Sequence, residues 1–493
     1  MKDNHTFNQR LSAALGIVAF AILLAGAAAA SRAQQAAGPV VRPPNGDPNA
    51  ALAATVPDGF TVAATGDLIV HRPISNEADP AMQAVFKILR GATVSVGNFE
   101  GTAIDVRHFR GAPQAENGGA WIIDLPGVPD DVKRMGFSMV ERANNHATDW
   151  GVEGMEETDK RLDDAGLIHA GTGKDLAAAR APRYLDTPVG RVALVSMASS
   201  FLPMSRAMDP LGETNGRPGL SALRTTAYTV VPQDLFDQIK RVGDELQALK
   251  KQAGIPAPSA PPGGNPPKPN EVNLNGARFR LGDRFGLSYD MDSFDLQQIL
   301  KGIRQGKESA NFLIATIHCH EPGNWSEQPA DFLVTLAHDA IDQGADEFVA
   351  QGPHQLRGIE IYKGKPIFYS LGNFIFQNLM LDPVGMDYYL SFHLNPDTAT
   401  DEEFDYALTK RGFWDPVWFE SVVAVSRFDR NQVSEIDLYP IDLGFERPAP
   451  DFGNPRMAPP AAAKKILERL QRLSTPYHTP IEIRNNVGVI KLR

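Results

Sequence analysis

The chain has 493 residues, of which 43% are hydrophobic and 22% charged, with 43 glycines and 38 prolines. This composition is ordinary for a large globular protein, so it excludes a coiled coil, a collagen-like chain, a polytopic membrane protein and a wholly disordered chain. The single cysteine, Cys319, excludes a disulfide framework and a cysteine-built zinc site. The formal net charge of −11 leaves no basic footprint for nucleic acid.

The first 33 residues have the layout of a secretory signal. Lys2 and Arg10 precede an apolar run over residues 11–30, and residues 31–33 fit a small-x-small cleavage site. We therefore predict a signal peptide at 1–33 and an exported protein, periplasmic or extracellular. The apolar run is also long enough to span a bilayer, so a retained membrane anchor at 11–30 is the alternative.

The remaining chain predicts one α/β domain. Residues 34–58, rich in Ala, Pro and Gly, predict a linker, and the domain follows at 59–493. Residues 254–270 contain seven prolines and predict a Pro-rich surface insertion. The alternation of strands and helices is typical of a helix-flanked sheet. The sequence predicts strands at 60–65, 93–96, 191–198, 311–317, 347–350, 418–428 and 433–438, and helices at 129–135, 153–165, 330–343 and 461–473.

Five clusters of polar residues stand at the ends of predicted strands. Each cluster alone has a structural reading, such as a turn at Asp67 or a helix N-cap at Asn144. Together they favour a metal site, because the carboxyl ends of strands form the ligand crevice of open α/β sheets. Carboxylates and imidazoles suit Mn, Fe or Zn, and two such ions make a hydrolytic pair. The clusters are Thr65-Gly66-Asp67, Gly97-Asn98-Phe99-Glu100, Asn144-Asn145-His146, Ile317-His318-Cys319-His320-Glu321 and Gly352-Pro353-His354.

Two histidines of one cluster are two residues apart. In a strand, this spacing points His318 and His320 to the same face and Cys319 to the other. Cys319 is therefore expected to be a small buried apolar residue and not a nucleophile.

An ordered set of motifs resembles the CapA family of poly-γ-glutamate capsule biosynthesis proteins, whose fold is similar to calcineurin-like metallophosphatases. The resemblance extends from Phe60 to Arg493. It implies a metallophosphatase-like sandwich of β-sheets flanked by helices. The matching stretches are TVAATGDLIVHRPI, SVGNFEG, ANNHATDWG, HAGTGKDLAAARAP, TIHCHEPGNW and GPHQLRGIEIYKGKPIFYSLGNFIF.

The resemblance also implies roles for individual residues. His146 would act as the acid toward a leaving group, with Asp149 orienting its imidazole. Ile69 and Gln351 stand where metallophosphatases often have histidines, which leaves the second metal site depleted or bound through Gln351. The metal ligands implied are Asp67, Glu100 (as the bridging carboxylate), Asn145, His318, His320 and His354, with Asn98 and Asn373 in support.

Two divalent ions would suit phosphoester hydrolysis, or amide hydrolysis or transfer on a glutamyl polymer. The alternatives are a non-catalytic assembly factor that binds polymer in the same cleft, and a metal-free scaffold. The expected partners are an anionic polymer or phosphoester substrate and capsule-assembly membrane proteins. Arg357 and Lys363 are candidate receivers of an anionic substrate, with a solvated surface position as the competing interpretation.

Overall fold

The computed structural model describes residues 49–114, 121–255, 268–381 and 383–492. The expected signal segment 1–33, linker residues 34–48 and residues 256–267 of the Pro-rich insertion lie outside these ranges. Residues 54–493 form one compact unit. Within the described residues, no helix has the length and apolar character needed to cross a membrane.

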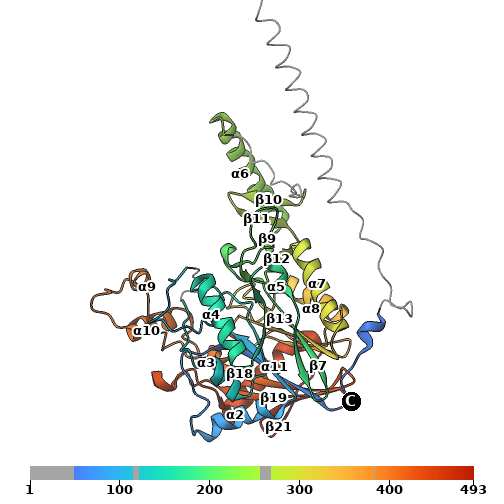
Figure 1. Ribbon diagram of the computed structural model, residues 1–493. Coiled ribbons are helices and arrows are strands. Elements are labelled where there is room, and N and C mark those ends of the chain that lie inside the picture. The colour runs from blue at the N-terminus through green and yellow to red at the C-terminus, as the bar shows by residue number, and fades with distance from the viewer. Residues whose placement is uncertain (1–48, 115–120, 256–267, 382, 493) are drawn as a thin grey trace, which may run out of the picture. The chain divides into compact units, whose positions relative to one another are not determined.

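Strand β1 is the centre of the first sheet, which has ten strands among the described residues. Figure 1 labels β18, β19 and β21 of this sheet. It pairs in parallel with β2 and β17 and antiparallel with β18. Nearly every residue of β1 is buried, as expected for a strand covered on both faces. The strands are β1 (Phe60–Ile69), β2 (Val94–Phe99), β3 (Met139–Glu141), β4 (Ile168–Ala170), β17 (Asn373–Phe376), β18 (Glu420–Asp429), β19 (Gln432–Asp442), β20 (Arg456–Met457), β21 (Glu482–Arg484) and β22 (Val487–Lys491).

The second sheet has six strands within the described ranges, in the order β15-β16-β14-β13-β7-β6. Its central strands β7, β13, β14 and β16 run parallel. The strands are β6 (Arg183–Thr187), β7 (Gly190–Ala198), β13 (Phe312–His318), β14 (Glu347–Gln351), β15 (Ile359–Tyr362) and β16 (Lys365–Phe368).

The two sheets pack face to face between layers of helices. Val62 of β1 shares one buried apolar cluster with Leu194 and Phe312 of the second sheet. The next residue, Ala63, points to the opposite face and packs with helices α2 and α3, because side chains alternate along a strand. Helices α7 and α8 cover the outer face of the second sheet. This arrangement confirms the predicted sandwich of sheets flanked by helices. The helices are α2 (Pro80–Gly91), α3 (Val128–Met135), α4 (Gly151–Asp164), α5 (Leu176–Arg180), α7 (Ser293–Glu308), α8 (Asp331–Asp342) and α11 (Pro460–Ser474).

Two additions to the sandwich were not predicted as structured elements. The first is a four-stranded sheet with helix α6 (Gln233–Gln252), and the Pro-rich segment connects α6 to β10. The second contains α9 (Met386–Ser391) and α10 (Asp401–Gly412), between β17 and β18. The strands of the small sheet are β9 (Thr225–Val231), β10 (Glu271–Leu274), β11 (Ala277–Leu281) and β12 (Gly286–Met291), and β5 (Thr172–Gly173) pairs separately with β8 (Gly219–Leu220).

Strand β1 continues beyond its predicted end at Thr65 to Ile69, so Asp67 lies within the strand. The extension exists because β17 pairs with Asp67, Leu68 and Ile69 on one side and β2 pairs with Asp67 and Leu68 on the other, and the register against β17 shifts between Asp67 and Leu68. Gly66 permits the close approach of the neighbouring chain. A Cβ at this position would lie 1.7 Å from the carbonyl oxygen of Gly372.

Candidate metal centre

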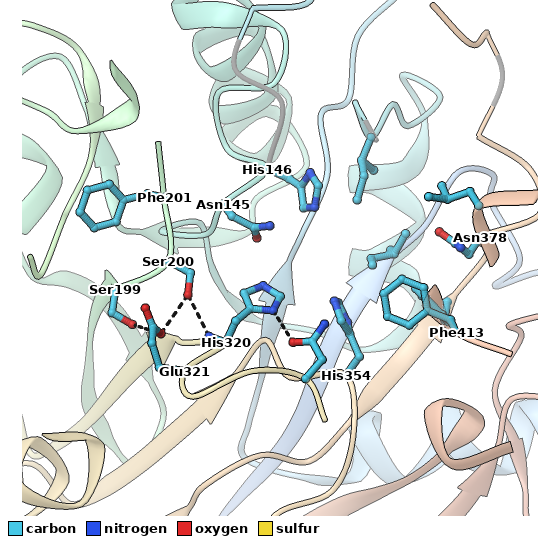
Figure 2. Close-up of a pocket in the computed structure, with 15 residues that line it drawn as sticks. Asn145, His146, Ser199, Ser200, Phe201, His320, Glu321, His354, Asn378 and Phe413 are labelled. Atoms are coloured by element: carbon cyan, nitrogen blue, oxygen red, sulfur yellow. Dashed lines mark hydrogen bonds between the residues drawn. The ribbon is translucent and has the colours of Figure 1, made fainter. Parts of the chain in front are cut away.

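The carboxyl ends of strands from both sheets meet at one edge of the sandwich. The first sheet supplies Asp67 from β1, Glu100 from the segment after β2, and Asn145 with His146 from the loop after β3. The second sheet supplies residues at the ends of β13 and β14. Figure 2 shows Asn145, His146, His320 and His354 around a common space. The structure thus brings all the predicted site residues into one region.

Asp67 is fixed by hydrogen bonds from three directions. Its backbone N–H donates to Gly372 O at 3.1 Å. Its carboxylate accepts from Asn98 Nδ2 at 2.9 Å and from the Gly352 N–H at 3.2 Å. His354 Nδ1 lies 3.5 Å from Asp67 Oδ2. The carboxylate is fully buried, so its position is set by the strands and not by solvent.

Glu100 lies at the centre of the cluster. Its side chain belongs to two groups of closely spaced potential ligands: Glu100, His318 and His320, and Asp67, Glu100 and His354. Glu100 Oε1 lies 3.6 Å from His318 Nε2, and it accepts no hydrogen bond from the described residues. A carboxylate shared by two groups is the geometry required of a bridging ligand.

The electrostatics around Glu100 favour a cation. Burial, followed by the nearby carboxylates of Asp67, Glu141 and Asp149, raises the pKa of Glu100 well above its usual value. These acidic groups repel one another in a buried region that has few compensating charges. A divalent cation between them would remove this repulsion.

His318 and His320 face each other, with their Nε2 atoms 2.9 Å apart. Burial, reinforced by His320, His354 and His146, lowers the pKa of His318 well below its usual value. Burial likewise lowers the pKa of His320 to about 4. Both imidazoles are therefore neutral near pH 7, which is the protonation state that binds metals.

The surroundings of these two histidines differ. His318 Nδ1 lies 3.0 Å from Asn98 Nδ2, whereas His320 Nδ1 lies 2.7 Å from Asn324 Oδ1. The intervening Cys319 is fully buried and packs in the core beneath α8. This burial agrees with the expectation drawn from the alternation of side chains along a strand.

His354 sits in a constrained backbone conformation. Its φ is +56°, in the left-handed region that non-glycine residues seldom adopt. Its Nδ1 lies 2.9 Å from Asn373 Oδ1, and Asn373 Nδ2 donates back to His354 O at 3.2 Å. Asn373 therefore holds both the ring and the backbone of His354, which is the supporting place expected for it.

Gln351 lies at the end of β14, where metallophosphatases often have a histidine. Its Nε2 donates to Thr65 O at 3.0 Å. Its Oε1 is buried and accepts no hydrogen bond from any described residue. A buried amide oxygen in this state can serve as a metal ligand.

His146 is paired with Asp149 through a short contact, 2.7 Å from Nδ1 to Oδ2. Asp149 Oδ2 also accepts the backbone N–H of Ile122 at 2.9 Å. The other ring nitrogen, His146 Nε2, lies 3.9 Å from Glu100 Oε1. The pairing fixes the orientation of the imidazole, and the catalytic role assigned to it stays a prediction.

Sequence reasoning placed Asn144 and Glu321 in strand-end clusters without assigning them a role at the site, and it missed Asn324, Ser199 and Ser200. Asn144 Nδ2 donates to Asn98 Oδ1 at 2.9 Å and to Phe99 O at 2.8 Å, so it connects two of the loops. Asn324 positions His320. Both lie in stretches that carried the family resemblance, so their amide groups were the available signal. Ser199, Ser200 and Glu321 form a further wall, in which both hydroxyls donate to Glu321 Oε2, at 2.9 and 3.0 Å.

The surface interpretation of Arg357 was wrong. Arg357 is fully buried, and its guanidinium donates to the carbonyl oxygens of Glu321, Gly323 and Ser326. It holds the loop after β13 and does not line the cleft. Lys363 is exposed and pairs with Asp342 at 2.5 Å.

A cavity of about 380 Å³ lies directly above the cluster (Figure 2). Ser199, Ser200, Phe201 and Glu321 form one side, and Phe413 lies on the opposite side. The cavity thus gives a ligand access to Asn145, His320 and His354, whereas Asp67, Glu100 and His318 are fully buried and do not line it.

Comparison with known proteins identifies the family. The model described as "Bacterial capsule synthesis protein PGA_cap" matches residues 61–378. "Uncharacterized protein y4sH" of Sinorhizobium fredii is 46% identical over 90% of this chain and 96% of its own. "Capsule biosynthesis protein CapA" of Bacillus anthracis is 23% identical over 64% of this chain and 60% of its own. A probable polyglutamine synthesis accessory protein of Mycobacterium tuberculosis is 26% identical over 47% of this chain and 43% of its own. This chain therefore belongs to the CapA-like family of bacterial capsule synthesis proteins.

Proposed function

We propose that this protein is an exported, metal-dependent hydrolase that acts in capsule polymer biosynthesis. The observation that carries the proposal is the position of Glu100, which is common to two groups of potential ligands and has a carboxylate oxygen that accepts no hydrogen bond from the described part of the chain. Two divalent ions, drawn from Mn, Fe and Zn, match this set of carboxylate, imidazole and amide groups.

The residues fit two neighbouring ions. One ion would be held by Glu100, His318 and His320, and the other by Asp67, Glu100 and His354. Asn145 and Gln351 are candidates to complete the sites, because each brings a side-chain oxygen to this edge of the sheets. When bound, the ions would acidify a water molecule and stabilise negative charge on the group under attack.

The protein supplies the proton for the leaving group in this proposal. His146 lines the cavity, and Asp149 holds its Nδ1, so Nε2 is the nitrogen available to the substrate. Asp149 would also stabilise the imidazolium form, because its carboxylate lies beside the ring. Asn98 and Asn373 would hold the ligand side chains in position through their hydrogen bonds.

A bond in a phosphoester or in an amide of a glutamyl polymer is the expected target. The relatives carry names that refer to capsule and polyglutamine synthesis, which supports a polymer substrate or one of its precursors. The leader at 1–33 supports action outside the cytoplasm, either as a released protein or anchored by 11–30 beside capsule-assembly membrane proteins.

A second function is favoured by one specific observation. Ile69 and Gln351 replace histidines that metallophosphatases often have, so the second ion would be bound weakly. A protein with one occupied site could bind polymer in the same cleft with little turnover. It would then serve as a non-catalytic assembly factor.

Elemental analysis together with a substrate screen tests the proposal. The mature protein, which lacks only the predicted signal peptide, would be incubated with Mn, Fe or Zn and then assayed on phosphoesters and on γ-glutamyl amides. We expect bound metal and metal-dependent turnover, both lost in His318→Ala. His338→Ala is the matched control. His338 belongs to α8, which covers the outer face of the second sheet, and it pairs there with Glu360.

Each result separates the alternatives. Bound metal without turnover on either substrate class would favour the assembly factor. Wild-type protein that binds none of the three metals would refute the metal centre and promote the metal-free scaffold.

A further inference from the structure

The cavity above the metal cluster opens into a second compartment. This compartment has a volume of about 590 Å³ and shares Asn324, Leu408 and Phe413 with the first. The two volumes are therefore adjoining parts of one cleft. A ligand bound at the metal cluster can extend over Phe413 and Leu408 into the second part.

The walls of the second compartment come mainly from the addition between β17 and β18. Helix α9 contributes Tyr388, its C-cap residue is Phe392, and α10 contributes Leu408 and Arg411. The rings pack against one another beneath the surface, where Phe404 contacts both Tyr388 and Phe392 with ring centroids 5.4 and 5.1 Å apart. The start of α10 is fixed by a capping box between Thr400 and Glu403. This support indicates a preformed wall.

Positive charge is scarce in this cleft. Among the described residues that line its two compartments, Arg411 is the only Lys or Arg. Its guanidinium lies over the Phe392 ring at 5.1 Å, and among the described residues it has no ion pair with a carboxylate. Asp387 lines the same compartment. In a protein of net charge −11, an anionic ligand would find attraction only at bound metal and at Arg411.

We propose that Arg411 and the α9–α10 wall form a subsite for an extended polycarboxylate. One acidic group of the ligand would lie at the metal cluster. A carboxylate further along the same molecule would pair with Arg411, and the intervening methylene groups would pack on Phe413 and Leu408. This inference rests on the proposed function, and it specifies how that site selects its ligand.

The single positively charged side chain along the cleft favours a polycarboxylate over a polyphosphate as the ligand. Both polymers carry a negative charge on every repeating unit, but the repeat of a polyphosphate is short, so its charges are dense and would require several cations along the cleft. The repeat of a γ-linked glutamate chain is longer, and methylene groups lie between its carboxylates, which matches one guanidinium beside several aromatic rings.

Equilibrium binding of γ-linked glutamate oligomers to the metal-loaded full chain tests the subsite. Four variants would be compared with the wild type over a series from the free amino acid to long oligomers. Arg411→Gln removes the charge, and Arg411→Lys retains it. Lys410→Gln removes the adjacent, exposed charge on the same helix and is the matched control, because Lys410 does not line the cleft. Asp387→Asn removes the opposing charge.

We expect Arg411→Gln to weaken the binding of long oligomers by about 3- to 10-fold and to leave the binding of free glutamate unchanged. Arg411→Lys should recover part of the loss, Lys410→Gln should match the wild type, and Asp387→Asn should tighten binding. The effect of Arg411→Gln should shrink at high salt, because the contact is exposed.

Three results would overturn the inference. The first is an equal loss in Arg411→Gln and Lys410→Gln, and the second is a loss that does not depend on oligomer length. The third is Arg411-dependent binding of inorganic polyphosphate but not of glutamate oligomers. If the wild type holds metal and cleaves a small phosphoester but binds no oligomer, only the subsite fails. If it holds no metal, the proposed function fails as well.

Discussion

Replacing Glu100 by Gln should change stability in opposite directions with and without metal. In the metal-free protein, the carboxylate is buried among Asp67, Glu141 and Asp149, and one of its oxygens has no hydrogen-bond donor among the residues that the structure describes. A neutral amide removes the repulsion and can donate to a neighbouring carboxylate. The variant should therefore be more stable than the wild type when metal is absent.

The magnitudes follow from the same contacts. Relief of a buried, unsatisfied acidic group is worth about 1–3 kcal/mol in the free energy of unfolding. A metal present at a hundredfold excess over its Kd stabilises the wild type by about 2.7 kcal/mol. Glu100→Gln should lose most of that gain, because Glu100 is common to both ligand groups. Added metal should thus reverse the order of stability of the two proteins.

Chemical denaturation with and without chelator measures both effects, with bound metal determined on the same samples. Glu347→Gln is the matched control, because Glu347 is an equally buried carboxylate at the opposite end of β14 from the site. This control should keep the full stabilisation by metal. A metal-free Glu100→Gln protein that is less stable than the wild type, or one that gains as much from metal, would refute the reasoning.

Three further predictions follow from individual groups. His146→Ala should retain bound metal while turnover falls by about 10²–10⁴-fold, measured as rates beside elemental analysis, and a loss of metal would instead make His146 a ligand. Burial raises the pKa of Glu347 to about 8, so the folded protein binds this proton more tightly than the unfolded chain does. The stability that this proton contributes is complete below the unfolded pKa of 4.5 and is lost as the pH rises to about 8, at about 1.4 kcal/mol per pH unit. The free energy of unfolding of Glu347→Gln, measured by denaturation at several pH values, should lack this dependence on pH. N-terminal sequencing of exported protein should find a mature start near Gln34, and intact Met1 on cytoplasmic protein would contradict export.

The residues that the structure gathers at the candidate metal centre could be located from sequence because their signals are local. His318 and His320 show a two-residue spacing at the end of an apolar strand, and Asp67 follows a glycine in another. A sheet brings the ends of its strands together whatever the lengths of the connections between them. Short motifs that locate the strand ends were therefore enough to predict which residues lie in the cluster.

The surroundings of the site could not be predicted in the same way. Arginine is usually a surface residue, and the burial of Arg357 depends on three carbonyl oxygens that only the folded loop after β13 provides. The extension of β1 to Ile69 depends on pairing with β17, about 300 residues later in the chain. Both features are tertiary, and no local pattern specifies them.

The two halves of the cleft differ in how much of them the family shares. The match to the family model covers residues 61–378, and this range contains all the predicted metal ligands. Helices α9 and α10 follow at 386–391 and 401–412, outside the matched range. Under the proposal, the strands of the sandwich hold the residues of the candidate metal centre, whereas an inserted wall that carries Arg411 contacts the rest of the ligand. Among the described residues, the two parts of the cleft share Asn324, Leu408 and Phe413, and the Phe413 ring also lies 5.2 Å from the ring of His354. Changes in the wall away from Phe413, such as at Arg411, should therefore alter which ligand is bound without moving the predicted metal ligands.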